Sequence, residues 1–286
     1  MVLGGTRFFG VHLVKELLKA GEQVTIATRG RASDPFGEQV GRIVVDRTDA
    51  GAMKAALAGW EFDVVYDDIA YCSNDVKAAL DAVSCGRYVL VSSASVYAER
   101  MDTKEEAFDP LSWKLAWCSR EDYPYDEIKR QAECALFQAY PEQNGAAVRF
   151  PYVIGPDDYT GRLRFYVEHI VRGEPMLVDN PDARIAFIDS AEAGRFLRHL
   201  GCRPETGPFN AASGGTASLR EIFACVEQKT GKRPVLSEAG EEAPYNGGES
   251  FSLNTARAEA AGFAFSPLED WLPGLLDSYL KEAADG

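Results

Sequence analysis

The sequence has few of the residues that build metal sites and disulfide frameworks. Among its 286 residues are three histidines, far apart in the sequence, and six cysteines, with no Cys-x-x-Cys pair among them. Scattered thiols of this kind favour free or buried cysteines in a reducing compartment over a zinc site or a disulfide-linked fold. We therefore expect no metal site and a cytoplasmic protein.

Positive charge and long apolar runs are also in short supply. Lys and Arg total 30 against 44 Asp and Glu, a formal net charge of −14, and such a chain repels a phosphate backbone. No apolar run reaches the ~20 residues of a membrane-spanning helix, and the first residues predict a strand and a glycine turn rather than a signal peptide. We expect neither nucleic acid nor membrane as a partner, although this charge is compatible with a local basic patch.

Short apolar runs alternate with helical patterns through the first half of the chain. This alternation predicts an α/β fold with a doubly wound parallel sheet that helices cover on both faces. The predicted strands are 1–3, 24–27, 43–45, 63–66, 88–91 and 146–150, and the predicted helices are 9–19, 50–57 and 74–83.

The pattern changes after Pro151, where glycine, proline and acidic residues interrupt it. We expect residues 186–189 to return briefly to the sheet, residues 238–249 to form an exposed loop, and amphipathic helices at 218–230 and 270–280. The later part of the chain is therefore predicted to be a smaller, mixed α/β region.

Three glycines, Gly4, Gly5 and Gly10, lie between the first predicted strand and the first helix. A glycine turn at this junction lets the backbone approach a pyrophosphate, and the helix N-terminus offers free N–H donors. The alternative is a purely structural turn, but the following series of strands and helices favours a nucleotide site. We therefore predict a dinucleotide-binding domain at 1–154, with a return segment near 185–212, and a mainly substrate-binding region at 155–286.

This segment resembles the glycine motif Thr-Gly-x-x-Gly-x-x-Gly of the extended short-chain dehydrogenase/reductases, the NAD-dependent epimerase/dehydratase family. The sequence differs from the motif at Arg7, which replaces the middle glycine. A guanidinium can bind phosphate bidentately, so Arg7 either contacts the cofactor or is an exposed arginine. The resemblance implies cofactor contacts from Gly4, Gly5, Thr6, Arg7, Phe8, Phe9 and Gly10.

Cofactor choice is read at the end of the second predicted strand. Arg29 and Arg31 follow it, and two arginines near a ribose 2′-phosphate favour NADP, with NAD still possible; the alternative is a solvated basic loop. The resemblance also implies that Asp46 contacts the adenine and that residues 69–71 pass the cofactor. The additional cofactor residues are Arg29, Arg31, Asp46, Ile69, Ala70 and Tyr71.

Tyr125 and Lys129 are four residues apart, which places them on one face of a helix. They follow the serine segment 92–95, and this order resembles the Ser, Tyr-x-x-x-Lys set of the same family. A nearby ammonium would lower the pKa of a phenol, so Lys129 is expected to tune Tyr125 as the proton-transferring residue. Ser93 would hold the reacting oxygen, with Ser92 and Ser95 as alternatives. The predicted catalytic residues are Ser93, Tyr125 and Lys129, and the last two would also contact the cofactor.

The segment after the sixth predicted strand resembles the family segment beside the nicotinamide. It implies cofactor contacts from Pro151, Tyr152 and Val153. Downstream, Arg162 and Arg164 could bind an anionic substrate group or be solvated residues at the start of a helix, and Trp113 and Trp117 could wall the pocket or serve in packing. The predicted substrate-binding residues are Ser93, Ser95, Tyr152, Arg162 and Arg164.

Tyr152 stands where many sugar-nucleotide members of the family have asparagine, and no acidic pair follows Ser93 as in dehydratases. We expect an NADP-dependent oxidoreductase or epimerase that acts on a hydroxyl or keto group of a sugar-like or sugar-nucleotide substrate. The alternative is a non-catalytic NADP-binding or RNA-binding protein, because chloroplast stem-loop RNA-binding members share a similar Gly-Gly-Thr-Arg-Phe opening. A homodimer is expected from the family, although core packing explains the apolar residues of the Tyr125 helix equally well.

Overall fold

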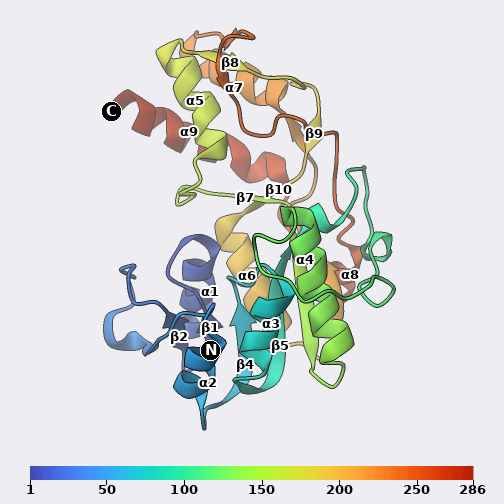
Figure 1. Cartoon of the computed structure of the whole chain (residues 1–286). Helices are drawn as coiled ribbons and strands as arrows, with labels where there is room; N and C mark the ends of the chain where they lie inside the picture. The colour runs from blue at the N-terminus through green and yellow to red at the C-terminus, as the bar shows by residue number, and fades with distance from the viewer. Residues whose placement is uncertain (286) are drawn as a thin grey trace.

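The computed structural model describes residues 1–285, and their central feature is a seven-stranded parallel sheet (Figure 1). The strand order is β11-β6-β5-β4-β1-β2-β3, and each neighbouring pair is parallel. The chain thus builds the sheet outward in one direction from β1 and then in the other, which confirms the predicted doubly wound α/β class. The strands are β1 (Val2–Leu3), β2 (Thr25–Thr28), β3 (Gly41–Val44), β4 (Glu61–Asp67), β5 (Ser84–Ser93), β6 (Gly145–Phe150) and β11 (Gly207–Asn210).

Helices cover both faces of this sheet (Figure 1). On β5, Val89 and Val91 pack into one apolar core, whereas Tyr88 and Leu90 pack into the other. Because both faces are buried, the strand is apolar on both sides, and its sequence is a continuous apolar run instead of an alternating one. The helices of the first face are α1 (Phe8–Lys19) and α6 (Ser190–Gly201), and those of the second are α2 (Ala50–Leu57), α3 (Ser73–Leu80) and α4 (Tyr125–Cys134).

A second region packs beyond the carboxyl edge of the sheet (Figure 1). Its core joins α5 (Arg162–Arg172), α7 (Leu219–Thr230) and α9 (Leu268–Asp285). Short strands complete it, namely β7 (Tyr152–Ile154), β8 (Pro175–Leu177), β9 (Arg184–Ile185), β10 (Phe187–Asp189), β12 (Ala217–Ser218), β13 (Val235–Leu236) and β14 (Glu241–Glu242). α8 (Ala256–Ala260) lies back beside β11, and short 3-10 or π turns occur at Gly37–Gln39, Ala94–Val96, Glu105–Ala107 and Ala135–Ala139.

Two expectations for this region are wrong. Residues 186–189 do not join the central sheet, because β10 pairs with β7 in a separate sheet while β11 takes the edge position beside β6. The segment 238–249 is not entirely loop, because β14 within it pairs with β8. Each pairing joins segments distant in sequence, so a local pattern does not indicate it.

The helices and strands of the first half lie where the sequence predicts them, with shifted ends. The largest difference is β5, which extends beyond the apolar run 88–91 at both ends. Its polar first half is held by pairing with β4 and by Arg87, whose side chain donates to Asn144 Oδ1 at 2.9 Å and to the Leu200 carbonyl at 3.0 Å.

Over residues 1–285, no helix has the length and apolarity required to cross a bilayer.

Gly194 lets α6 pack directly against α1. A methyl group at this position would lie 2.6 Å from the backbone nitrogen of Leu13, a distance that real side chains do not adopt. The two helices could then not keep their present separation.

We predict that Gly194→Ala lowers the free energy of unfolding by about 1–3 kcal/mol through overpacking, despite the better helix propensity of alanine. The matched control is Gly274→Ala in α9, where the added methyl meets open space and propensity alone should stabilise by up to ~1 kcal/mol. Urea unfolding measures both. Equal effects of the two substitutions would contradict the close approach of α1 and α6.

Candidate functional site

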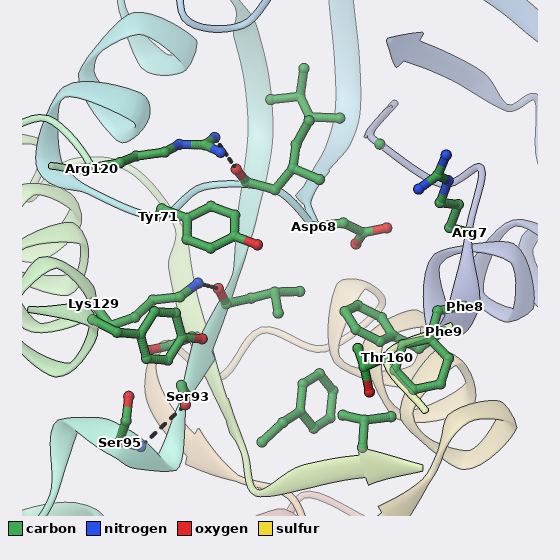
Figure 2. Close-up of a pocket in the computed structure, with 18 of the residues that line it drawn as sticks. Arg7, Phe8, Phe9, Asp68, Tyr71, Ser93, Ser95, Arg120, Lys129 and Thr160 are labelled. Atoms are coloured by element: carbon green, nitrogen blue, oxygen red, sulfur yellow. Dashed lines mark hydrogen bonds between the residues drawn. The ribbon is translucent and has the colours of Figure 1, made fainter. Parts of the chain in front are cut away.

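The main pocket opens at the carboxyl ends of the sheet strands, beside the point where the strand order reverses between β1 and β4. Open α/β sheets bind ligands at this switch point, because loops diverge there and leave a crevice. The cavity is about 1050 Å³, at or above the upper end of the ~300–1,000 Å³ of ordinary small-ligand sites. Its lining comes from β1, β2, β5, β6 and α4, and from the segments that directly follow β3 and β4. Figure 2 shows part of this lining.

The glycine turn forms one wall of this pocket. Gly4 and Gly5 have φ values of +107° and +80°, a backbone conformation that side chains disfavour. Gly10 allows close packing, since a methyl there would lie 3.0 Å from Gly5 Cα. α1 begins directly after the turn without a side-chain cap, so its first N–H groups and its positive dipole end are available to an anion.

Arg7 and Phe8 connect this turn to the loop before α5. Arg7 is exposed, and its guanidinium lies 5.7 Å from the Tyr159 ring, while the Phe8 ring meets the same tyrosine edge-on at 6.0 Å. Phe8 has φ +53°, a strained value for a residue other than glycine. Arg7 lies beside the glycine turn (Figure 2), so its position allows the predicted contact with a cofactor phosphate.

α4 presents Tyr125, Lys129 and Glu133 at successive turns toward the carboxyl edge of the sheet. Lys129 is buried, and its ammonium donates to the Ala70 carbonyl at 2.7 Å and to the Val91 carbonyl at 3.0 Å (Figure 2). These carbonyls follow β4 and lie near the end of β5. Burial lowers the pKa of Lys129 to about 8, although Asp67 and Asp75 oppose this.

Tyr125 lies at the first turn of α4 and is half exposed to the pocket. Desolvation raises its pKa above the ordinary value, and a hydrogen bond with Ser93 opposes the rise. This direction differs from the expectation that Lys129 lowers the pKa of Tyr125. The reason is geometric: the Lys129 ammonium is bound to backbone carbonyls and lies 5.9 Å from the centre of the Tyr125 ring.

Tyr71 stands between two cations at the edge of the same pocket. The Arg120 guanidinium is 4.2 Å from the ring centre and the Lys129 ammonium is 4.9 Å from it, distances at which a cation is attracted to an aromatic face. Arg120 is itself held by Asp75 and by the Ile69 carbonyl. The Tyr71 hydroxyl faces the pocket (Figure 2).

One turn beyond Lys129, Glu133 forms a fully buried ion pair with Arg149 of β6, with 2.6 Å between Nη2 and Oε2. Glu133 also accepts from the Ser92 hydroxyl at 2.5 Å, and Arg149 donates to the Glu105 and Phe108 carbonyls. Breaking such a pair on one side typically costs ~3–5 kcal/mol, because the remaining charge stays buried. The network fixes the end of β5, where Ser93 accepts from the Ser95 N–H at 3.1 Å.

A basic edge lies at the end of β2. Arg29 and Arg31 are exposed and line the pocket, and among the described residues neither has an acidic partner within ion-pair distance. Asp46 lies nearby and accepts from Thr48 Oγ1 at 2.7 Å; that contact, reinforced by both arginines, lowers the pKa of Asp46. A carboxylate therefore lies beside the two arginines at this edge of the pocket.

The opposite end of the pocket is aromatic. Tyr152 packs against Tyr245 with ring centres 4.5 Å apart, and the Arg162 guanidinium lies 5.3 Å from the Tyr152 ring. Arg164, expected here, instead pairs with Glu282 at 2.8 Å and does not line the cavity. Its position two residues after Arg162 puts it on another side of α5.

The tryptophans expected as a possible wall are not part of the cavity lining. Trp113 packs edge-on against Phe108 and donates to Glu127, and Trp117 lies beside the Lys77 ammonium. Aromatic packing outside the cavity thus describes Trp113, whereas Trp117 makes a contact with a cation. In the stretch 1–285, no cluster of three or more His, Cys, Asp or Glu side chains could hold a metal ion.

Nearly all the residues predicted from the sequence line this single cavity. The lining includes Gly4, Gly5, Thr6, Arg7, Phe8, Phe9, Arg29, Arg31, Asp46, Ile69, Tyr71, Ser93, Ser95, Tyr125, Lys129, Pro151, Tyr152, Val153 and Arg162. Gly10 and Ala70 lie behind it and act through packing or a carbonyl. The lining residues that the sequence analysis did not single out include Asp68, Tyr97, Glu99, Arg120, Tyr159, Thr160 and Phe251; Asp68, directly after an apolar strand, carried the clearest overlooked signal.

Residues 1–81 match the model of the NAD dependent epimerase/dehydratase family. The match covers the glycine turn and the basic edge, and it confirms the predicted resemblance to this family. The similarity to the family therefore includes the residues that form the predicted nucleotide end of the pocket.

The similarity to individual proteins covers more of the chain. A chloroplast stem-loop binding protein of 41 kDa from Arabidopsis thaliana is 28% identical over 70% of this chain and 54% of its own length. A 2′-dehydrokanamycin reductase from Streptomyces kanamyceticus is 26% identical over 70% of this chain and 57% of its own. The chain thus spans little more than half the length of these relatives. The structure of MoeE5 in complex with UDP-glucose and NAD aligns with a TM-score of 0.74 and 21% identity, over 99% of this chain and 98% of that one, which establishes a shared fold.

Proposed function

We propose that this chain is an NADP-dependent oxidoreductase or epimerase that acts on a hydroxyl or keto group of a sugar-like substrate. The observation that carries the proposal is the common cavity: the glycine turn, the basic edge, Ser93, Tyr125 and Lys129 all line it. A family match at residues 1–81 supports the nucleotide half. In this account residues 1–154, with β11 returning to the sheet, bind the dinucleotide, and residues 155–286 mainly shape the substrate end.

The glycine turn fits a dinucleotide diphosphate, because its backbone has no side chain in the way and the uncapped start of α1 points its N–H groups there. When bound, the nicotinamide would supply or accept a hydride. Tyr125 would give a proton to a carbonyl oxygen, or take one from a hydroxyl, while Ser93 holds that oxygen by a hydrogen bond. Lys129 would hold α4, and with it Tyr125, against the ends of β4 and β5 through its bonds to the Ala70 and Val91 carbonyls.

The substrate end supports a ring-shaped, weakly charged substrate. Tyr152 and Phe251 offer aromatic faces, and Arg162 offers one guanidinium. Relatives point the same way, since one is a reductase whose name refers to 2′-dehydrokanamycin and a protein of the same fold binds UDP-glucose. A cytoplasmic location and a homodimer remain predictions.

A second candidate function, RNA binding, is favoured by the similarity to the stem-loop binding protein. The net charge of −14 opposes it. A salt-dependent shift of RNA by micromolar protein would support RNA binding, whereas NADPH oxidation by the same preparation with a ketone or sugar nucleotide would support the enzyme.

For the catalytic role, we predict that Tyr125→Phe lowers kcat about 10²–10⁴-fold, the usual contribution of a positioned acid or base. The affinity for NADPH should stay within about threefold, because the diphosphate and ribose contacts lie elsewhere. NADPH oxidation against a panel of ketones and sugar nucleotides measures the first quantity, and fluorescence titration the second. Tyr123→Phe is the control, since Tyr123 is equally exposed but outside the cavity. Full activity of Tyr125→Phe would contradict the assignment.

For cofactor choice, we predict that the double variant Arg29→Ala, Arg31→Ala weakens NADPH binding about 10- to 100-fold, because charge-assisted contacts to a 2′-phosphate are lost. NADH binding should change less than about threefold. Arg42→Ala, which removes a guanidinium of neighbouring β3 that pairs with Asp34, is the control. Equal losses for NADPH and NADH would show that the arginines do not select the 2′-phosphate.

A further inference from the structure

Asp68 is a carboxyl group without a partner beneath the glycine turn. Both of its oxygens are buried, and neither has a hydrogen-bond partner among the described residues. Its neighbours on the turn are very close: an added methyl would lie 2.5 Å from Asp68 Oδ2 at Gly10 and 3.7 Å from it at Gly4. The carboxyl group points toward the side of the pocket that carries Arg7 (Figure 2).

The charged neighbours do not neutralise Asp68. Asp67, directly before it, is negative but already bound by Arg47 and by the Tyr88 hydroxyl. Lys129 and Arg120, across the pocket with Tyr71, are bound to carbonyls and to Asp75. No ion pair between Arg7 and Asp68 occurs within the range 1–285, and the Arg7 guanidinium lies beside Tyr159.

A buried carboxylate without a partner is strongly disfavoured, so such a group keeps its proton. The pKa of Asp68 is accordingly well above its ordinary value, because of burial first and the charge of Asp67 second; the nearby Gly5 N–H, which does not meet hydrogen-bond geometry, opposes the rise only in part. When the Asp68 side chain is uncharged, the positive end of the α1 dipole dominates the electrostatic potential at the turn. The ionised form would place a negative charge directly behind it.

We propose that Asp68 is a specificity-determining residue of the nucleotide site, which accepts a dinucleotide diphosphate only while Asp68 is an uncharged carboxylic acid. The inference rests on the proposed function, because it assigns the diphosphate to the glycine turn. The inference adds that the Asp68 side chain must be protonated for binding. When Asp68 loses its proton, its carboxylate repels the two negative charges of the diphosphate. Nucleotide affinity therefore falls as pH rises through the pKa of Asp68 in the free protein.

The test measures binding of ADP-ribose by isothermal titration calorimetry between pH 5.5 and 9. This probe has the diphosphate but no nicotinamide, and its diphosphate does not titrate in this range. For the wild-type chain the Kd should rise with pH and approach a tenfold increase per pH unit once the pH exceeds the Asp68 pKa of the free protein, since one proton is linked to binding. In Asp68→Asn, an uncharged group of the same shape, the Kd should vary less than about twofold. Lys129 is unchanged in the variant, so its own titration does not produce the difference.

Asp63→Asn is the matched control, because Asp63 lies near the start of β4, the strand that Asp68 directly follows, and outside the cavity. It should retain the wild-type profile.

The stability of the fold supplies a second readout. Because the Asp68 pKa is higher in the folded chain than in the unfolded chain, the unfolded chain loses this proton at a lower pH. The wild type therefore loses stability as pH rises above the ordinary aspartate pKa. Asp68→Asn should then melt at a higher temperature than the wild type at pH 7.5, with a smaller difference at pH 5.

Parallel Kd profiles for the wild type and Asp68→Asn, with binding intact, would overturn the proton requirement and leave the proposed function standing. A wild-type Kd that is constant over the whole range would do the same. Failure of the wild type to bind ADP-ribose at every pH would contradict the nucleotide site itself, and this inference with it.

Discussion

The buried ammonium of Lys129 is the contact on which the geometry of the pocket depends. It joins α4 to the carbonyl oxygens of Ala70 and Val91, and so fixes a helix to the ends of two adjacent strands. A buried cation is tolerated only where oxygen atoms replace its water, and the carboxyl ends of β4 and β5 supply them. Because Tyr125 is one turn earlier on the same helix, this contact also sets the position of the phenol at the pocket.

The same helix makes a second buried contact one turn later. Glu133 accepts from Ser92, Arg149 donates to the backbone carbonyls of Glu105 and Phe108, and both charged side chains are fully buried. Such pairs are costly to bury, and their best-attested benefit is a unique arrangement of the groups around them. Here the arranged groups are the end of β5 and the segment that follows it, which together carry Ser93. Three successive turns of α4 thus place a phenol at the pocket, an ammonium against the ends of two strands, and a carboxylate in a buried ion pair.

The first half of the fold was accessible from sequence because its determinants are local. Apolar runs such as 88–91, the glycine turn and the four-residue spacing of Tyr125 and Lys129 each report on a single element. Strand pairings of the second region are not local: β10 and β7 are more than thirty residues apart, and nothing in either segment indicates the other. The same limit explains Arg164, whose partner Glu282 lies more than a hundred residues away.

Electrostatics at the site was the least predictable property. The lysine-to-phenol effect anticipated from spacing is outweighed by desolvation, since Lys129 faces carbonyls and Tyr125 has its pKa raised. The same holds for Asp68. Only the three-dimensional contacts reveal that this aspartate lies beneath the glycine turn and that its carboxyl group has no hydrogen-bond partner among the described residues. Burial is decided by residues from many segments, so the sign of a pKa shift cannot be read from neighbours in sequence.

The proposed function requires one dinucleotide to span this cavity, from the basic edge past the glycine turn to α4. A crystal structure of the chain grown with NADPH tests it most directly. We expect density for the diphosphate against residues 4–10 and for the nicotinamide ring in contact with Tyr125 or Lys129. Density for the nucleotide at another surface, or a nicotinamide directed away from α4, would contradict it.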